Sequence, residues 1–390
     1  MMLLAIALVA FVSLGLPDGV LGVAWPSIRR SFDLPPAQLG LLLTTAMLGY
    51  VASSFSSGAV VARMGVGRLL FWSSALMVAN SVAYALAPAW GVMVAAGLLA
   101  GLGAGAIDAG INTFAAVRFS PRLVNWLHAA YGLGAALGPL LMTAALATSG
   151  GWRGGYALIG ALLALMAVAF RLTRRKWDTR PPEADAEARA GAALAPRLLE
   201  TLVRPRVWLN LALFFVYTGL EVSAGQWTYS LLTEARGISP GAAGGWIAAY
   251  WGGLAAGRIV SGALSGRIAA GTILRVATLG AVVSTLTLWH DPGMRVGLLA
   301  LPVLGGCLAP IYPLLIAETP RRLGDSHAAA AIGFQVAAAY VGTAAIPGLI
   351  GLFATAHGLG AIAPALFSTA LLLLLLQELT RRATVPPQAT

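Results

Sequence analysis

The chain has 390 residues, of which 58% are hydrophobic and 10% are charged, and its net charge is +11. A composition this poor in charge excludes a separate soluble domain and predicts a membrane protein. The single cysteine, Cys307, excludes an internal disulfide. The sequence contains no phosphate-binding loop and no zinc-ligand spacing, so we expect neither an enzyme nor a cofactor or metal site.

About 20 apolar residues cross the hydrocarbon core of a bilayer as a helix. The first such segment lacks a basic leader and a cleavage site, so it is interpreted as a retained helix and not as a signal peptide. The sequence therefore predicts an all-α membrane protein with twelve transmembrane helices, at residues 3–25, 39–62, 68–87, 91–117, 126–148, 152–171, 207–231, 243–264, 272–289, 295–317, 327–354 and 358–378.

The basic residues are distributed unevenly between the two sides of this topology. With a cytoplasmic N-terminus, the inner segments hold 19 of the 25 Lys and Arg residues and the outer loops hold five. This is the positive-inside bias, and it predicts that both termini are cytoplasmic. The net charge then needs no nucleic-acid partner. We expect a multi-pass, monomeric protein whose surroundings are the lipid bilayer of a plasma membrane, the bacterial inner membrane.

The spans fall into two halves that resemble each other. The longest polar stretch predicts a cytoplasmic linker at 172–206, between a bundle of six helices at 1–171 and another at 207–390. Short motifs recur in both halves; the pattern Gly-x-Ala-x-x-Pro, for example, begins at Gly134 and again at Gly342. Such parallel repeats predict two pseudo-symmetric six-helix bundles with a site between them.

Particular segments indicate the family. Residues 58–68 read GAVVARMGVGR and resemble the signature loop of the major facilitator superfamily. Residues 101–112, which contain Asp108 and Asn112, and residues 125–132, which contain His128, resemble the fucose permease-related branch. The resemblance implies the major facilitator fold, transport of a small molecule, and a role of the fourth-span acid in proton coupling.

Three acids lie inside the spans: Asp18, Asp108 and Glu221. A carboxylate in hydrocarbon is unfavourable by at least a few kcal/mol, so each is expected to face a polar path and to carry a coupling proton. His128 lies at a depth similar to that of Asp108, and an Asp–His pair could exchange a proton near neutral pH. The alternative is a neutral hydrogen bond that ties two helices together.

Polar and aromatic side chains near these acids are candidates for substrate binding. Each could instead make a structural hydrogen bond. The candidates are Asn112, Tyr131, Gln226, Trp227, Tyr312 and Gln335.

One base, Arg258, lies inside a span, and Glu318 ends the tenth span at a similar depth. This placement predicts a gate salt bridge on the cytoplasmic side. The leading hypothesis is a secondary active transporter that moves a small, sugar-like polar solute by alternating access, coupled to a proton. An efflux antiporter for drug-like or amphipathic compounds is the alternative, because residues 134–139 resemble a motif of drug/proton antiporters. A non-transporting receptor is a third possibility.

Overall fold

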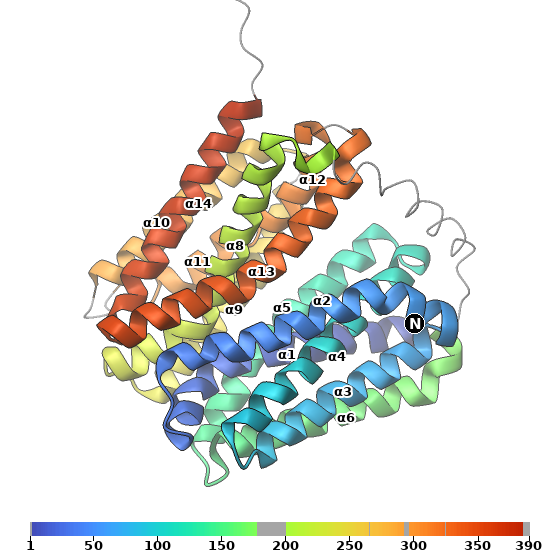
Figure 1. The fold of residues 1–390 in the computed structure, drawn as a ribbon, viewed down its shortest axis with the longest axis vertical. Helices are drawn as coiled ribbons and strands as arrows, with labels where there is room; N and C mark the ends of the chain where they lie inside the picture. Colours follow the sequence, from blue (N-terminus) through green and yellow to red (C-terminus); the bar gives the residue numbers. More distant parts are fainter. Residues whose placement is uncertain (1, 178–199, 265, 292–295, 324, 385–390) are drawn as a thin grey trace, which may run out of the picture.

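The structure of the protein, a computed structural model, describes residues 2–177, 200–264, 266–291, 296–323 and 325–384. The secondary-structure elements in these ranges are helices, gathered in two bundles (Figure 1). The first bundle contains α1 (Met2–Ser31), α2 (Leu39–Met64), α3 (Val66–Leu86), α4 (Trp90–Arg118), α5 (Pro121–Leu146) and α6 (Gly151–Trp177), with the short η1 (Pro36–Gln38) before α2.

The second bundle repeats this arrangement. It contains α8 (Pro205–Ser230), α9 (Pro240–Leu264), α10 (Ala270–His290), α11 (Ala300–Leu308), α12 (Ile311–Leu323), α13 (Asp325–His357) and α14 (Ile362–Thr384), with short helices η2 (Leu231–Ala235) and η3 (Leu359–Ala361).

Most of the predicted spans are single helices. By length and composition, eleven spans among the described residues could cross a membrane, with α11 and α12 forming one of them. The helix α9 has 25 residues and lies in the second bundle, beside α11. It brings the number of spans to the predicted twelve. The prediction of an all-α membrane protein with twelve transmembrane helices is therefore confirmed.

Several helices extend a few residues beyond the predicted spans, and two further differences concern the linker and the tenth span. The helix α6 continues to Trp177, so residues 172–177 of the predicted linker are helical, and residues 178–199 lie outside the described part. The tenth span is broken in two, because Pro310 and Pro313 cannot donate backbone hydrogen bonds at the junction of α11 and α12.

Glycine allows the helices of each bundle to pack closely. A Cβ atom on Gly134 of α5 would lie 2.0 Å from the carbonyl oxygen of Val12 on α1. A Cβ atom on Gly342 of α13 would lie 2.2 Å from the carbonyl oxygen of Phe215 on α8. Small residues let membrane helices approach in this way. The repeated motif thus makes the same helix contact in each half.

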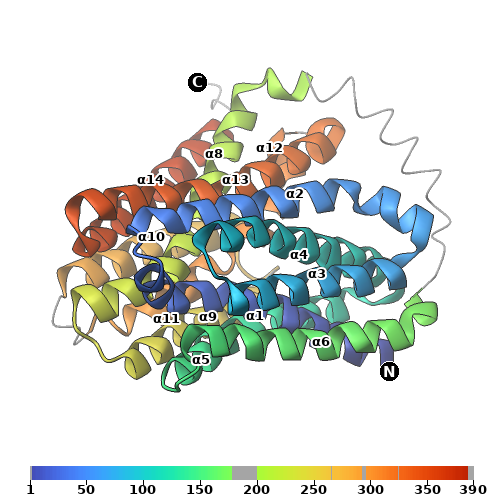
Figure 2. The same cartoon turned by 60° about the horizontal axis from the view of Figure 1, so that its bottom comes forward.

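The two bundles meet at one end of the molecule, which we call the closed end. There Arg29 at the end of α1 forms an ion pair of 2.9 Å with Glu234 of η2. The backbone N–H of Ala37 also donates to the hydroxyl of Thr355, at 3.1 Å. The bundles diverge toward the other end, the open end, which carries the N-terminus (Figures 1 and 2).

Substituting Gly342 by alanine is expected to destabilise the protein by about 1–3 kcal/mol, because the added methyl group would overlap backbone atoms of α8. The readout is the thermal unfolding midpoint of the purified protein in detergent. The matched control is Gly333→Ala on the same helix, where a Cβ atom has no neighbour within 4 Å. An equal midpoint for both variants would contradict the predicted packing.

Candidate transport site between the two bundles

The three acids inside the spans each accept a hydrogen bond from a tyrosine. Tyr131 of α5 donates to the carboxylate of Asp18 on α1. Tyr50 of α2 donates to Asp108 on α4, at 2.7 Å. Both contacts join two helices of the first bundle. A charge-assisted hydrogen bond replaces part of the hydration that a carboxylate loses in the membrane.

The third acid, Glu221, contacts three polar side chains. Its carboxylate accepts a hydrogen bond from Tyr217, one turn earlier on α8. Its other carboxylate oxygen lies 4.0 Å from the guanidinium of Arg258 on α9. Tyr250 of α9 donates to the backbone carbonyl of the same residue at 2.8 Å. Glu221 therefore lies in a small polar cluster that joins α8 to α9.

Arg258 links this cluster to the first bundle. Its guanidinium carbon lies 5.9 Å from the centre of the Tyr131 ring, the same ring whose hydroxyl contacts Asp18. A cation over an aromatic face is attracted by the ring quadrupole. The contacts therefore run from Asp18 through Tyr131 and Arg258 to Glu221, across the interface between the bundles. We call these four residues and Tyr217 the central cluster.

Arg258 does not form the predicted pair with Glu318 in this structure. Glu318 forms an ion pair with Arg321 on its own helix, at 3.2 Å, and Arg258 faces Glu221. The break between α11 and α12 explains the difference. The helix α9, which carries Arg258, packs against α11, whereas Glu318 lies beyond the break on α12, which packs against α13, α10 and α8.

Asp108 lies in a second polar group. Besides the bond from Tyr50, its carboxylate accepts one from Asn112 at 2.9 Å, one turn later on α4. The ring of Tyr50 lies 4.3 Å from that of Tyr340 on α13, between ring centres, so this group also reaches the second bundle. Neither Tyr50 nor Tyr340 was predicted from the sequence. The available signal was a phenol in mid-span, which needs a hydrogen-bond partner.

His128 and Asp108 both belong to the described part of the chain, and no hydrogen bond joins them there. The ring of His128 packs edge-on against Phe11 of α1, with 5.4 Å between ring centres, and its side chain is exposed. The structure thus gives Tyr50 and Asn112 as the hydrogen-bond partners of Asp108, and the proton exchange with His128 stays a prediction.

The remaining candidates divide into two kinds. Tyr312 packs against Phe214 and lies 6.3 Å from the Tyr217 ring, between ring centres, so it borders the central cluster. Gln226 donates to the backbone carbonyl of Asp18 at 2.9 Å, between the bundles. Its side-chain oxygen is buried and has no hydrogen-bond partner among the described residues.

Two predicted substrate residues lie inside the protein packing. Trp227 is fully buried and donates to the carbonyl of Pro347, at 2.9 Å. Gln335 is also fully buried and accepts a hydrogen bond from Thr319, at 3.0 Å. Both residues tie α13 to a neighbouring helix. Both residues lie close in sequence to other polar candidates, but in the structure their side chains point into the contacts between helices.

A family model fixes the class of protein. The model of the Major Facilitator Superfamily matches residues 6–347. The chain belongs to this superfamily, and it is therefore a multi-pass membrane transporter of small molecules and not an enzyme. This result confirms the family to which the sequence was predicted to belong.

Known relatives are distant in sequence. The chain is 26% identical over 399 residues to the 3-(3-hydroxy-phenyl)propionate transporter of Escherichia coli K12, covering 100% of this chain and 96% of the relative. It is 24% identical over 389 residues to the sodium-dependent glucose transporter 1 of Homo sapiens, covering 88% and 72%.

Solved structures share the fold. A D-xylose-proton symporter superposes with a TM-score of 0.75 at 14% identity, covering 95% of this chain and 96% of the other. The superfamily transporter FucP, in an outward conformation, gives a TM-score of 0.64 at 16% identity, covering 97% and 98%. At these identities the likeness establishes the fold alone.

A double-mutant experiment tests which acid partners Arg258. Arg258→Gln leaves Glu221 without its counter-ion and is expected to lower stability by about 1–3 kcal/mol, since a charge in a partly buried site loses its compensation. Adding Glu221→Gln should restore part of the loss, whereas adding Glu318→Gln to Arg258→Gln should not. The measurement is the unfolding midpoint in detergent. Recovery when Glu318→Gln, but not Glu221→Gln, is added to Arg258→Gln would contradict the observed pairing.

Proposed function

We propose that the protein is a proton-coupled symporter of a small, sugar-like polar solute, working by alternating access in a bacterial inner membrane. One observation carries the proposal: three carboxylates lie at mid-span, each bonded to a tyrosine. Contacts from these acids and their tyrosines cross the interface between the bundles. Ionisable groups inside a membrane protein usually serve an ion or substrate path.

The polar groups suit both tasks of a symporter. Asp108, held by Tyr50 and Asn112, can accept a proton without moving, because both partners can rotate to bond the protonated form. Phenols and amides near the interface can bond the hydroxyl groups of a sugar, and aromatic faces can cover its apolar face. Two similar proteins, a sodium-dependent glucose transporter and a D-xylose-proton symporter, support this substrate class.

The conformation follows from the proposed orientation. If the positive-inside bias holds, the open end is cytoplasmic and the closed end faces outward. The ion pair between Arg29 and Glu234 then belongs to an outer gate, and the structure represents an inward-open state. In an inward-open state an inner gate pair is separated, so the pairing of Arg258 with Glu318 in the inward-closed state stays a prediction.

The antiporter alternative rested on the motif at residues 134–139. In the structure Gly134 and Gly138 of this motif pack directly on backbone carbonyls of α1, at Val12 and Leu16. Helix packing thus accounts for the motif, and it does not favour efflux over uptake.

Asp108→Asn should abolish uphill, proton-driven accumulation while substrate counterflow at equal pH survives. The amide keeps the shape and the hydrogen bonds but cannot exchange the proton. Proteoliposomes tested with radiolabelled glucose or D-xylose provide the measurement, and Asp33→Asn, the same substitution at an exposed residue just after α1, serves as the control. Accumulation at the wild-type level by Asp108→Asn would shift the coupling role to Glu221 or Asp18.

The orientation is tested by cysteine labelling in a Cys307→Ser background. Lys176→Cys lies at the open end, in the exposed last turn of α6, and Thr148→Cys lies at the closed end. A membrane-impermeant maleimide should label Thr148→Cys in intact cells and Lys176→Cys only after lysis. The reverse pattern would invert the proposed topology and make the structure outward-open.

A further inference from the structure

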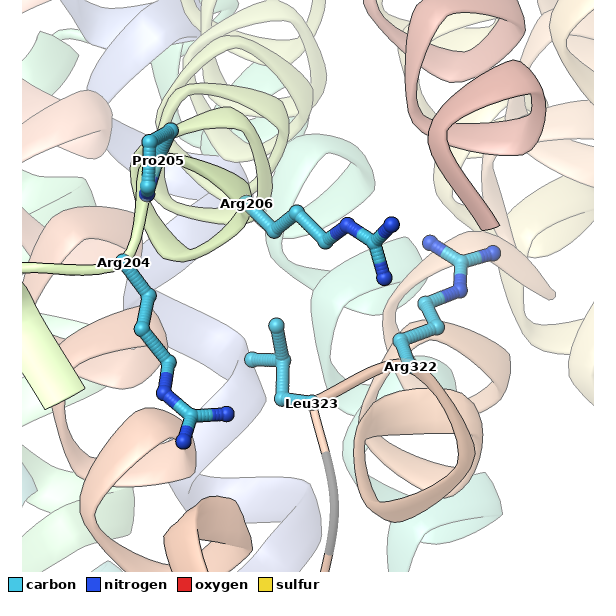
Figure 3. A pocket seen from close by; sticks show the side chains of 5 residues that line it. All are labelled: Arg204, Pro205, Arg206, Arg322 and Leu323. Atoms are coloured by element: carbon cyan, nitrogen blue, oxygen red, sulfur yellow. The ribbon is translucent and has the colours of Figure 1, made fainter. Parts of the chain in front are cut away.

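A basic cavity lies at the open end of the second bundle, away from the central cluster. Its volume is ≈ 510 Å³, and it is lined by Arg204, Pro205, Arg206, Arg322 and Leu323. The close-up in Figure 3 shows the side chains of Arg206 and Arg322 reaching into the same space, with Arg204 on the other side of Leu323. Three guanidinium groups thus surround one opening.

The described side chains place little negative charge beside these arginines. Among the residues whose side chains the structure describes, no carboxylate lies within ion-pair distance of Arg204, Arg206 or Arg322. Arg322 makes only a long contact of 3.5 Å with the side-chain oxygen of Asn210. Glu318, four residues before Arg322 on α12, is already paired with Arg321. Gathered like charges repel one another, so the cavity favours an anion.

The local backbone adds to the positive potential. Pro205 is the first residue of α8, a helix of 26 residues, and no side chain caps this end. The unpaired N–H groups and the dipole of a long helix give its N-terminus a partial positive charge. The helix end and the three side chains therefore act on the same volume. Guanidinium groups bind phosphate oxygens in pairs, with geometry as well as charge.

The surroundings of the cavity place it at the depth of lipid headgroups. Next to it, Trp208 is 58% exposed and donates its indole N–H to the carbonyl of Leu202, and Val203 is 81% exposed. Exposed tryptophan with its polar edge bonded is typical of the membrane–water interface. Below the arginines, Val207, Leu323 and Ala331 form a small apolar cluster of their own. The cavity thus has arginines around its opening and buried apolar packing beside Leu323.

We propose that Arg204, Arg206 and Arg322 form a binding site for a phosphate-bearing anion, distinct from the transport site. The phosphate could belong to the headgroup of an anionic phospholipid or to a free phosphate. A basic pocket between transmembrane helices on the cytoplasmic side, where anionic lipids concentrate, has the chemistry to hold such a headgroup. A ligand there would bridge the start of α8 and the end of α12.

The lipid source is tested with the purified, delipidated full-length protein. Native mass spectrometry would count bound phosphatidylglycerol against phosphatidylcholine, for the wild type and for Arg206→Gln and Arg322→Gln. Each variant should bind phosphatidylglycerol about fivefold more weakly, because one arginine near an anionic headgroup contributes about that factor. Arg206→Lys should retain most of the binding. The charge-matched controls Arg118→Gln and Arg174→Gln, at the same end of the first bundle, should bind as the wild type does.

The free-phosphate source is tested by thermal shift, with potassium phosphate compared with potassium chloride at equal ionic strength. A phosphate-specific stabilisation that Arg206→Gln removes would identify a soluble anion, and selective binding of phosphatidylglycerol would identify a lipid. Either result supports the site. Loss of binding in the control variants to the same degree, or anion binding that Arg206→Gln and Arg322→Gln leave unchanged, would overturn it. Wild-type unfolding midpoints for the variants establish that they are folded.

Discussion

The structure depends on the compensation of three carboxylates that lie inside transmembrane helices. Each accepts a hydrogen bond from a tyrosine, and Glu221 also faces Arg258. A lone carboxylate in hydrocarbon would be unfavourable by several kcal/mol, whereas these hydrogen bonds replace much of the hydration that the carboxylate loses. Since two of the three tyrosines come from another helix than the acid, the same bonds that make the acids tolerable also position the helices around them.

Close packing makes these bonds possible. Glycines let α1 and α5, and likewise α8 and α13, approach until backbone meets backbone. In the first bundle this approach brings Tyr131 to Asp18. In the second, Thr218 of α8 donates to the carbonyl of Ala339 on α13 at 2.7 Å. The two halves therefore use one packing rule with different polar partners, which allows a pseudo-symmetric scaffold to hold an asymmetric site.

Charges serve different purposes at different depths. At mid-span they are few and are each matched by a partner, as for Arg258 and Glu221. At the closed end the ion pair of Arg29 and Glu234 crosses between the bundles, where a change of state must break it. At the open end arginines gather without matching acids among the described residues, in a region where headgroups or solutes can neutralise them.

The sequence by itself determined the twelve spans, the two halves and the identity of the acids, because hydrophobic length and buried charge are properties of single segments. Only the tertiary structure decided the partners. Tyr50 bonds Asp108, Arg258 faces Glu221 and not Glu318, and Trp227 lies in the helix packing. Hydrogen-bond partners depend on the rotation and tilt of neighbouring helices, which are set by close contacts such as those at Gly134 and Gly342 and cannot be obtained from spacing along one helix.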